Sequence, residues 1–228
     1  MYNLAIGDRT YSSWSLRGWL MFAKFDILVN VDTARMKTPE FSEMLQAYGN
    51  GRQVPALRIE GAHDTIFVAD TLAIAETLHE RHPEKSMWPK DPVARGFART
   101  IVAEMHAGFT TLRNDCAMNL RHCYNGFSPS DALRVELSRL DTIWQAARAY
   151  PNPDGPWLFG EYSLADAFYA PVATRIATYG LPVGDVAAAY VKTTLNDPVF
   201  KAWRAAGLAE NYVQPGYDLD LQTVVWPV

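Results

Sequence analysis

The sequence has 228 residues, of which 49% are apolar and 20% are charged, and its formal net charge is −4 at pH 7. Because domains commonly contain roughly 100 to 150 residues, this length suits two small domains better than one. The composition is globular, and no window approaches the roughly 20 uncharged apolar residues of a membrane span. The acidic balance argues against nucleic-acid binding, which depends on clustered Lys and Arg.

The sequence shows neither an export signal nor a disulfide or zinc pattern. Its first residues lack a basic region, an apolar run and a small-residue cleavage site, so we expect a cytosolic protein. Its two cysteines, Cys116 and Cys123, have no second pair, which excludes a zinc ligand set and a disulfide framework. Both fall on a helical apolar stripe, which predicts two buried, reduced thiols. The other members of the stripe are Ile101, Met105, Phe109, Leu112 and Leu120.

The first 82 residues alternate strand and helix patterns. In chain order they predict a strand over 2–7, a helix over 14–25, a strand over 27–31, a helix opened by Pro39 and Glu40, a break at Gly49-Asn50-Gly51, strands over 54–59 and 65–68 around a tight turn, and a helix over 70–82. The order β-α-β-α-β-β-α, with a hairpin near its end, is that of a thioredoxin-like domain.

Beyond this region the patterns are helical. Pro83 and the Pro-containing stretch 88–92 predict a linker over 83–92, which separates a thioredoxin-like domain over 1–82 from an all-helical domain over 93–228. Ser163 and Asp166 have the spacing of a capping box at a helix start. The fold class is therefore α/β plus all-α. Helices are predicted over 92–123, 129–149, 163–178, 185–195 and 197–206, with no convincing strand before the irregular tail.

The turn before the first helix, Tyr11-Ser12-Ser13-Trp14-Ser15-Leu16-Arg17, holds the most informative residues. In a thioredoxin-like layout this turn presents the free N–H groups of a helix N-terminus, which favour an anion. A redox thioredoxin has Cys-x-x-Cys there, so the serines of this chain exclude thiol–disulfide exchange by a protein thiol at this position. A serine hydroxyl here can donate a hydrogen bond to a bound thiolate and lower its pKa, or it can simply cap the helix.

The segment Gln53-Val54-Pro55 and the pair Asp70-Thr71 form a second group of candidate ligand residues. A proline that opens a strand is a candidate cis peptide, and the backbone of Val54 would then be free to pair with an extended peptide ligand. The Thr71 hydroxyl and nearby amides suit a carboxylate, while the Asp70 carboxylate suits an ammonium. The pair therefore predicts recognition of an amino-acid head group such as γ-glutamyl, although either residue alone is also an ordinary helix cap.

Taken in order, these motifs resemble those of the cytosolic glutathione transferases. Ser12-Ser13-Trp14-Ser15-Leu16-Arg17 is similar to the Ser-Ser-Cys-x-Trp-Arg signature of the zeta class, with Trp14 in place of its cysteine and Leu16 in place of its tryptophan. The opening around it and the segment Ala103–Phe109 resemble a bacterial zeta-like subgroup related to maleylacetoacetate isomerase. The resemblance covers nearly the whole chain. Asp70-Thr71 departs from the usual family pair, Glu or Gln followed by Ser.

The resemblance implies that the first domain binds glutathione as co-substrate and that the helical domain completes a pocket for a small electrophile. It implies Ser12 as the catalytic residue that activates the glutathione thiol, Val54 as the backbone partner of the cysteinyl unit, and Asp70 and Thr71 as the γ-glutamyl clamp. It also implies a homodimer that needs no metal and no nucleotide. The other residues of the expected glutathione site are Ser13, Trp14, Gln53 and Pro55.

Further residues are candidates for the electrophile side of this pocket. His106, Thr110 and Arg113 share one face of a predicted helix, which flanks the electrophile pocket in the family. Arg175 lies on the helix that begins at the capping box. Tyr11 is an alternative donor to the thiolate, as in other transferase classes.

Three functions are open at this point. The first is conjugation of glutathione to a small electrophile. The second is glutathione-dependent cis–trans isomerisation of the maleylacetoacetate type, which needs cationic side chains for a dicarboxylate, with Arg17, Arg113 and Arg175 as candidates. Arg175 lies about one turn before the arginine of the zeta isomerases, and the bulky Trp14 narrows the pocket, so we favour conjugation or thiol-dependent reduction. The third is a transferase fold kept for binding without turnover.

Overall fold

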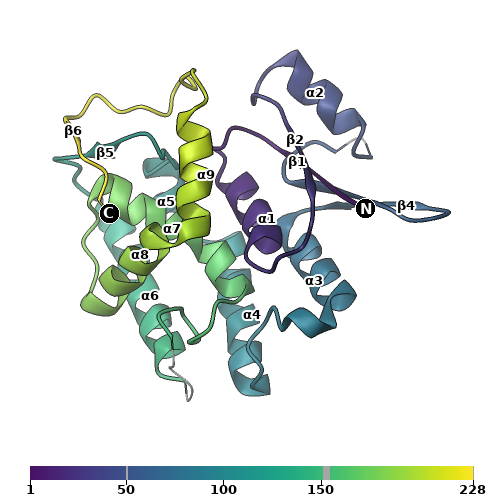
Figure 1. The fold of residues 1–228 in the computed structure, drawn as a ribbon. Coiled ribbons are helices and arrows are strands. Elements are labelled where there is room, and N and C mark those ends of the chain that lie inside the picture. Colours follow the sequence, from purple (N-terminus) through teal and green to yellow (C-terminus); the bar gives the residue numbers. More distant parts are fainter. Residues whose placement is uncertain (50, 151–154, 228) are drawn as a thin grey trace.

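The computed structural model describes residues 1–49, 51–150 and 155–227 (Figure 1). Asn50 of the expected break, and residues 151–154 and 228 of the expected helical domain, lie outside the described residues. Figure 1 shows a part with a β-sheet, which holds the N-terminus, beside a group of helices, which holds the C-terminus. Within the described ranges, every helix is too short or too polar to span a membrane.

Four strands form the sheet: β1 (Tyr2–Ile6), β2 (Asn30–Thr33), β3 (Ala56–Glu60) and β4 (Thr65–Ala69). Their order is β2-β1-β3-β4, with β1 parallel to β2 and antiparallel to β3, and β3 antiparallel to β4. The first three helices are α1 (Ser13–Ala23), α2 (Pro39–Gln46) and α3 (Thr71–Arg81). The predicted β-α-β-α-β-β-α order of a thioredoxin-like fold is therefore confirmed.

Strand β2 begins three residues later than the predicted strand over 27–31. The chain leaves α1 in a turn in which Asp26 has a left-handed backbone with φ of 50° and the Ile27 N–H donates to the Phe22 carbonyl at 3.0 Å. Ile27 is buried in the core. Its apolar character therefore reflects packing of the turn and not membership of the sheet.

Helix α1 lies between the sheet and the helical part of the molecule (Figure 1). Its N-cap is Ser12, whose hydroxyl accepts from the Ser15 N–H at 3.2 Å. A Cβ atom at Gly18 would lie 2.7 Å from the Pro55 ring, so a glycine is needed at this point of the helix. This close contact holds the strand-opening proline against α1.

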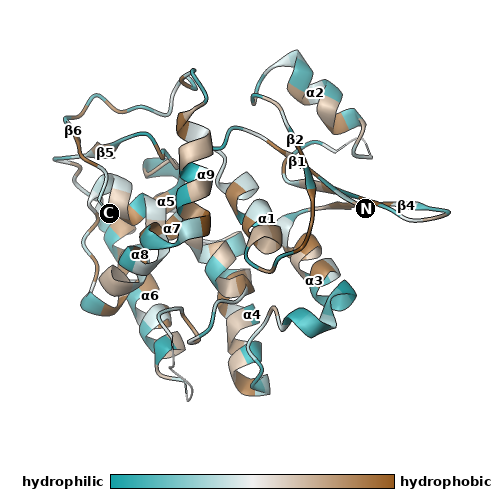
Figure 2. Cartoon of the chain, viewed as in Figure 1, coloured by the Kyte–Doolittle hydropathy of each residue, from teal (hydrophilic) through white to brown (hydrophobic). Residues whose placement is uncertain are grey.

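Among the described residues, six further α-helices follow α3. The expected linker contains a short 3₁₀ helix, Pro83–Lys85, and the division into two domains stays a prediction. Figure 2 shows both hydrophobic and hydrophilic residues on helices such as α4 and α6, as expected for helices that bury one face. The helices are α4 (Pro92–Ala107), α5 (Thr110–Asp115), α6 (Asp131–Arg148), α7 (Leu164–Tyr179), α8 (Asp185–Asn196) and α9 (Pro198–Leu208).

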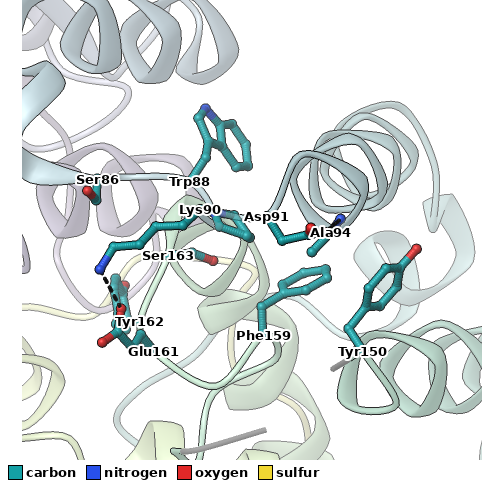
Figure 3. A pocket seen from close by; sticks show the side chains of 11 residues that line it. Ser86, Trp88, Lys90, Asp91, Ala94, Tyr150, Phe159, Glu161, Tyr162 and Ser163 are labelled. Atoms are coloured by element: carbon teal, nitrogen blue, oxygen red, sulfur yellow. Dashed lines mark hydrogen bonds and ion pairs between the residues drawn. The ribbon is translucent and has the colours of Figure 1, made fainter. Parts of the chain in front are cut away.

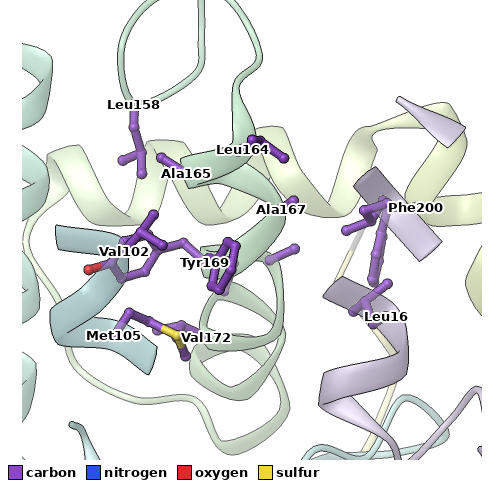
Figure 4. Close-up of a cluster of buried hydrophobic side chains, with 14 of the residues drawn as sticks. Leu16, Val102, Met105, Leu158, Leu164, Ala165, Ala167, Tyr169, Val172 and Phe200 are labelled. Atoms are coloured by element: carbon purple, nitrogen blue, oxygen red, sulfur yellow. The ribbon is translucent and has the colours of Figure 1, made fainter. Parts of the chain in front are cut away.

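Helix α7 forms the centre of the helical part. All of its residues except Ala177 are buried, and it packs against α1, α4 and α8. The predicted capping box is present, because the Ser163 N–H donates to the Asp166 carboxylate at 2.8 Å. Figure 4 shows Val102 of α4 beside Tyr169 of α7 in the hydrophobic core. The core therefore joins α7 both to the sheet-bearing part, through α1, and to the other helices.

The single helix predicted over 92–123 is wrong. Helix α4 ends at Ala107, and Phe109 has a left-handed backbone with φ of 53°, which separates α4 from the six-residue α5. A strand that the sequence did not predict follows and pairs antiparallel with the tail. These two strands are β5 (Cys123–Tyr124) and β6 (Thr223–Val224).

Between α5 and β5 lie residues 116–122, which we call the cavity loop. Side chains of α7 and α9 donate to its backbone carbonyls, so these groups do not need helical partners. The apolar spacing that includes Cys116 and Cys123 therefore reflects burial of a loop. Both cysteines are free and buried, as expected, and burial raises the pKa of Cys116 to about 12. The donated bonds are Arg175 Nε to Cys116 O (2.8 Å), Tyr179 OH to Ala117 O (2.8 Å), Thr178 Oγ1 to Asn119 O (3.0 Å) and Arg204 Nε to Leu120 O (2.9 Å).

Candidate functional site

A cavity of about 230 Å³ opens at the start of α1. Its walls come from the turn before α1, from α5, from the cavity loop, from α7 and from the tail. Of its lining residues, the sequence predicts Tyr11 to Trp14, Arg113 and Arg175 as site residues. The full lining is Tyr11, Ser12, Ser13, Trp14, Met36, Arg113, Ala117, Met118, Arg175 and Tyr217.

Ser12 lies in the cavity wall and also caps α1. Its Oγ lies 2.7 Å from the Ser15 Oγ, and the Ser15 Oγ accepts from the Gly7 N–H at 2.9 Å. When Ser15 donates its hydroxyl proton to Ser12, Ser12 accepts two hydrogen bonds and its own proton is free for a ligand. The cap and the catalytic role are therefore compatible.

Ser13, the next residue, has a partner from the other part of the molecule. Its Oγ accepts from the Arg175 Nη2 at 3.3 Å. Arg175 is only 5% exposed, and its Nη1 donates to the Pro171 carbonyl at 3.3 Å. Burial lowers the pKa of Arg175 to about 10, and the nearby Arg113 adds to this lowering.

Trp14, which replaces the cysteine of the zeta signature, is surrounded by cationic and polar groups. The Arg17 guanidinium lies over its ring, 4.2 Å from the centroid, and the Arg113 guanidinium lies 5.3 Å from it. His106 meets the same ring edge-on at 5.2 Å. Arg17 is 1% exposed, and its Nε and Nη1 have no hydrogen-bond partner among the described residues. Burial lowers its pKa well below the usual value, and Arg113 and Arg175 contribute further.

The predicted γ-glutamyl clamp lies at the start of α3, next to this cluster. Asp70 caps the helix by accepting from the Leu72 N–H at 2.8 Å, and its second carboxylate oxygen lies 3.2 Å from the His106 Nε2. Asp70 has φ of 77°, a strained backbone for a residue with a side chain. Thr71 is fully buried, and its hydroxyl has no partner among the described residues.

The segment Gln53-Val54-Pro55 lies outside the cavity lining. The Val54–Pro55 peptide bond is cis, and Pro55 packs on α1 at Gly18. Val54 is buried, whereas Gln53 is exposed. Val54 is also within packing distance of Gly7, at the end of β1. The segment is therefore fixed against the same end of the sheet as Ser12.

Tyr11 lies in the cavity wall opposite the tail. Its ring is 4.9 Å from that of Tyr217, and its hydroxyl is buried without a partner among the described residues. Burial raises its pKa, so the phenol stays protonated and can donate a hydrogen bond. The structure therefore keeps Tyr11 available as the alternative donor to a thiolate.

The expected face of His106, Thr110 and Arg113 does not form, because the helix breaks at Phe109. The break brings His106 and Arg113 together instead: the Arg113 Nη2 donates to the His106 carbonyl at 3.0 Å and also to the Met105 carbonyl. Thr110 is exposed and does not line the cavity. Sequence reasoning missed Met36, Ala117, Met118 and Tyr217, which are ordinary residue types brought to the cavity by long-range packing.

A second, smaller cavity of about 70 Å³ lies at the expected linker (Figure 3). It shares no lining residue with the first cavity. The ion pair at its mouth, Lys90 with Glu161 at 4.0 Å, is largely exposed. Across the described ranges, no group of three His, Cys, Asp or Glu side chains is placed to hold a metal ion.

Comparison with known proteins gives a consistent result for the fold. No family model matches the sequence. A glutathione transferase homolog from Burkholderia, solved with bound glutathione, superposes with a TM-score of 0.66 at 19% identity, covering 92% of this chain and 99% of that one. A maleylacetoacetate isomerase from Anaeromyxobacter dehalogenans, also solved with bound glutathione, gives a TM-score of 0.64 at 22% identity, covering 96% and 98%.

Sequence similarity to curated proteins is more local. Maleylacetoacetate isomerase from Rattus norvegicus is 33% identical over 107 residues, which is 46% of this chain and 48% of that protein. The enzyme of the same name from Mus musculus is 32% identical over the same shares. The match thus spans about half the length of these relatives.

The fold, with a cavity at the start of α1, is that of a glutathione transferase. The curated proteins that match about half of the chain are named maleylacetoacetate isomerase. The chain therefore has the fold of a glutathione transferase and is similar, over about half of its length, to proteins named maleylacetoacetate isomerase, in agreement with the resemblance of its N-terminal motifs.

Proposed function

We propose that the protein is a glutathione transferase in which Ser12 stabilises the glutathione thiolate for attack on a small electrophile. The main support is the position of the Ser12 hydroxyl, which caps α1 and lines a cavity that α5 and α7 also line. A thiolate at this place meets both a hydroxyl donor and the partial positive charge of a helix N-terminus. The bound glutathione in the structural neighbours gives independent support.

In this proposal glutathione extends from the cavity toward the start of α3. Its cysteinyl unit pairs with the backbone of Val54, and its γ-glutamyl ammonium binds Asp70, while the Thr71 hydroxyl faces the carboxylate. The contacts from Trp14 to His106 and from His106 to Asp70 connect the cavity wall with this clamp.

The chemistry requires no covalent bond to the protein. The thiol proton leaves to solvent, and Ser12 donates a hydrogen bond to the remaining thiolate. The sulfur then bonds to the electrophilic carbon, while an aryl halide releases its halide ion or an epoxide opens its C–O bond and its oxygen takes a proton from solvent. We propose that neither a metal nor a nucleotide takes part, so treatment with a chelator should leave the rate unchanged.

Titration calorimetry with glutathione, conjugation assays with aryl halide and epoxide substrates, and peroxide reduction assays test the proposal. We expect binding of glutathione, a thiolate absorbance that appears at lower pH than for free glutathione, and turnover with at least one electrophile. No binding contradicts the proposal. Binding with no turnover across the panel favours the alternative of a binding protein that has the transferase fold.

Isomerisation of a maleylacetoacetate-type substrate is the second candidate. It is favoured by the presence of two guanidinium groups, those of Arg113 and Arg175, in the cavity wall, since arginine matches a carboxylate well. The names of the curated relatives point the same way. A maleylacetone isomerisation assay beside the conjugation panel decides between them: efficient isomerisation with only trace conjugation makes the isomerase the principal activity.

We further propose a cytosolic homodimer. The free, buried thiols of Cys116 and Cys123 suit a reducing compartment, and the exposed Ile66 and Phe67 on β4 offer apolar surface for a subunit contact. Light scattering should give twice the chain mass of 25.5 kDa at micromolar concentration. A strict monomer contradicts the dimer.

A further inference from the structure

The two neighbouring serines of the cavity wall have different surroundings. Ser12 makes its contacts within α1 and the turn before it, to Ser15. Ser13 makes its side-chain contact with Arg175, which comes from α7 in the helical part. Both hydroxyls line the cavity. The difference gives Ser13 a connection to a buried cation that Ser12 lacks.

Arg175 carries a charge that no described carboxylate neutralises. Its side chain is buried, and its three hydrogen bonds go to neutral oxygens, those of Ser13, Cys116 and Pro171. A guanidinium has five N–H donors, so two remain without a described acceptor. A buried cation in this position is costly unless an anion comes close to it. The cavity that Arg175 lines is the place where such an anion can bind.

We infer that Arg175 is a positioning residue that polarises Ser13, so that the Ser13 hydroxyl donates a second hydrogen bond to the glutathione thiolate. The Ser13 oxygen accepts from a cation, which strengthens its own O–H as a donor. Ser13 and Arg175 keep their protons throughout, and the thiol proton leaves to solvent. The inference rests on the proposed function, because it concerns the same bound thiol.

This role differs from that of an arginine that binds the carboxylate of an electrophile. Arg113 is better suited to that second task, because its side chain is less buried than that of Arg175 and borders the same cavity. Arg175 instead directs one nitrogen to a hydroxyl at the α1 N-terminus. The charged and titratable groups that face Arg175 from the packed elements are Arg17, Arg113, Cys116, Tyr179 and Tyr217.

The test measures the pKa of bound glutathione from its thiolate absorbance in Ser13→Ala, Arg175→Met and the double variant. We expect each single change to raise this pKa by about one unit, which is the size expected for losing one charged or hydrogen-bonding partner. If Arg175 acts through Ser13, the double variant should not exceed the larger single effect. Arg175→Lys, which keeps the charge, should restore part of the shift.

Arg204→Met is the matched control. Arg204 also donates to a carbonyl of the cavity loop, that of Leu120 at 2.9 Å, but it does not line the cavity. Its replacement therefore loosens the loop without removing a cation from the site, and the pKa of bound glutathione should stay at the wild-type value. A shift as large as that of Arg175→Met would assign the effect to the loop and overturn the inference.

Other outcomes are equally decisive. An unchanged thiol pKa in Arg175→Met, with a raised KM only for carboxylated electrophiles, makes Arg175 an electrophile-binding residue and overturns the inference. If Arg175→Met does not fold, Ser13→Ala decides alone, because an unchanged thiol pKa there also overturns it. Failure of the wild-type protein to bind glutathione overturns the proposed function together with the inference, whereas binding with unshifted variants overturns only the inference.

Discussion

The cavity has two walls that are built in different ways. In the wall at the start of α1, Ser12 is held by bonds within a few residues, from Gly7 to Ser15 and from Ser15 to Ser12. The cavity loop opposite is held by side chains from far along the chain, such as Arg175 and Arg204, which are 59 and 84 residues from their acceptors. The position of the Ser12 hydroxyl therefore depends on local structure, whereas the contact of Ser13 with Arg175 and the shape of the second wall depend on the packing of the helical part.

The largest expected effect comes from changing the first wall at Ser12. Ser12→Ala should raise the pKa of bound glutathione and lower conjugation by roughly 10- to 1000-fold, the range for loss of one such donor. Steady-state rates and the thiolate titration measure this. Ser130→Ala is the control, because Ser130 caps α6 in the same way, by accepting from the Leu133 N–H, and should leave the rate unchanged. If Tyr11→Phe abolishes the shift and Ser12→Ala is silent, Tyr11 is the catalytic residue.

A smaller effect is expected at the clamp, where the two parts of the molecule meet. Asp70→Asn should weaken glutathione binding by roughly 10- to 100-fold, because a hydrogen bond to a charged group contributes about 1.5 to 3 kcal/mol. The contact is present in ground and transition states alike, so KM should rise with kcat nearly unchanged. Calorimetry provides the direct measurement. Asp91→Asn, which alters the cap of α4, should have wild-type affinity, and unaltered affinity in Asp70→Asn removes Asp70 from the site.

The second wall should respond mainly in stability. Thr178→Val removes the donor to the Asn119 carbonyl and should lower the free energy of unfolding by about 1 to 3 kcal/mol, the cost of a buried group without a partner. Urea unfolding measures it. The same substitution at Thr142, whose hydroxyl donates to a carbonyl on the exposed face of α6, should change stability by less than about 0.5 kcal/mol. A shift in the pKa of bound glutathione in Thr178→Val would show that the two walls are not independent.

The smallest effect concerns the pH dependence of stability at His106. Burial lowers the pKa of His106, although Asp70 acts to raise it, so the unfolded chain takes up this proton at a higher pH than the folded protein. Neutral His106 therefore stabilises the folded protein above the ordinary histidine pKa of about 6.5. This contribution is lost as the pH falls through the pKa that His106 has in the folded protein. Unfolding curves between pH 8 and 5 should show a shallower loss for His106→Gln than for wild type.

Substitution of Asp70, which contacts His106, provides a second test of this pH dependence. Because Asp70 raises the His106 pKa, Asp70→Asn should lower the folded pKa further, so the loss of stability that begins near the unfolded histidine pKa should extend to lower pH and become larger. Identical pH profiles for wild type and His106→Gln would mean that His106 does not contribute to the loss.

The contrast between the walls also explains which parts of the fold could be predicted. The strand and helix order of the first 82 residues follows from local apolar periodicity and turn residues. The capping box of Ser163 and Asp166 can be predicted from a segment of four residues. The cavity loop has the apolar spacing of a helix, but its carbonyls find their partners on α7 and α9. A hydrogen-bond partner that lies so far along the chain cannot be predicted from the local sequence pattern.

Part of the cavity lining was predictable for a related reason. Ser12, Ser13 and Trp14 form a contiguous motif next to a strand end, so their place in the cavity follows from the fold. Tyr217 and Met36 reach the same cavity from the tail and from the segment after β2, and nothing in their immediate neighbours indicates this. Thr110 was misplaced because its position depended on the helix that breaks at Phe109.

The way in which the cavity loop is held has a consequence for protein engineering. Side chains of α7 and α9 donate hydrogen bonds to its main-chain oxygen atoms, including those of Ala117 and Leu120. Every residue type supplies such an oxygen. The side chain of Ala117, which borders the cavity, is therefore not needed for these hydrogen bonds. Libraries that vary this position can reshape the space offered to a substrate while the anchoring helices and the serine-bearing turn retain their wild-type sequence.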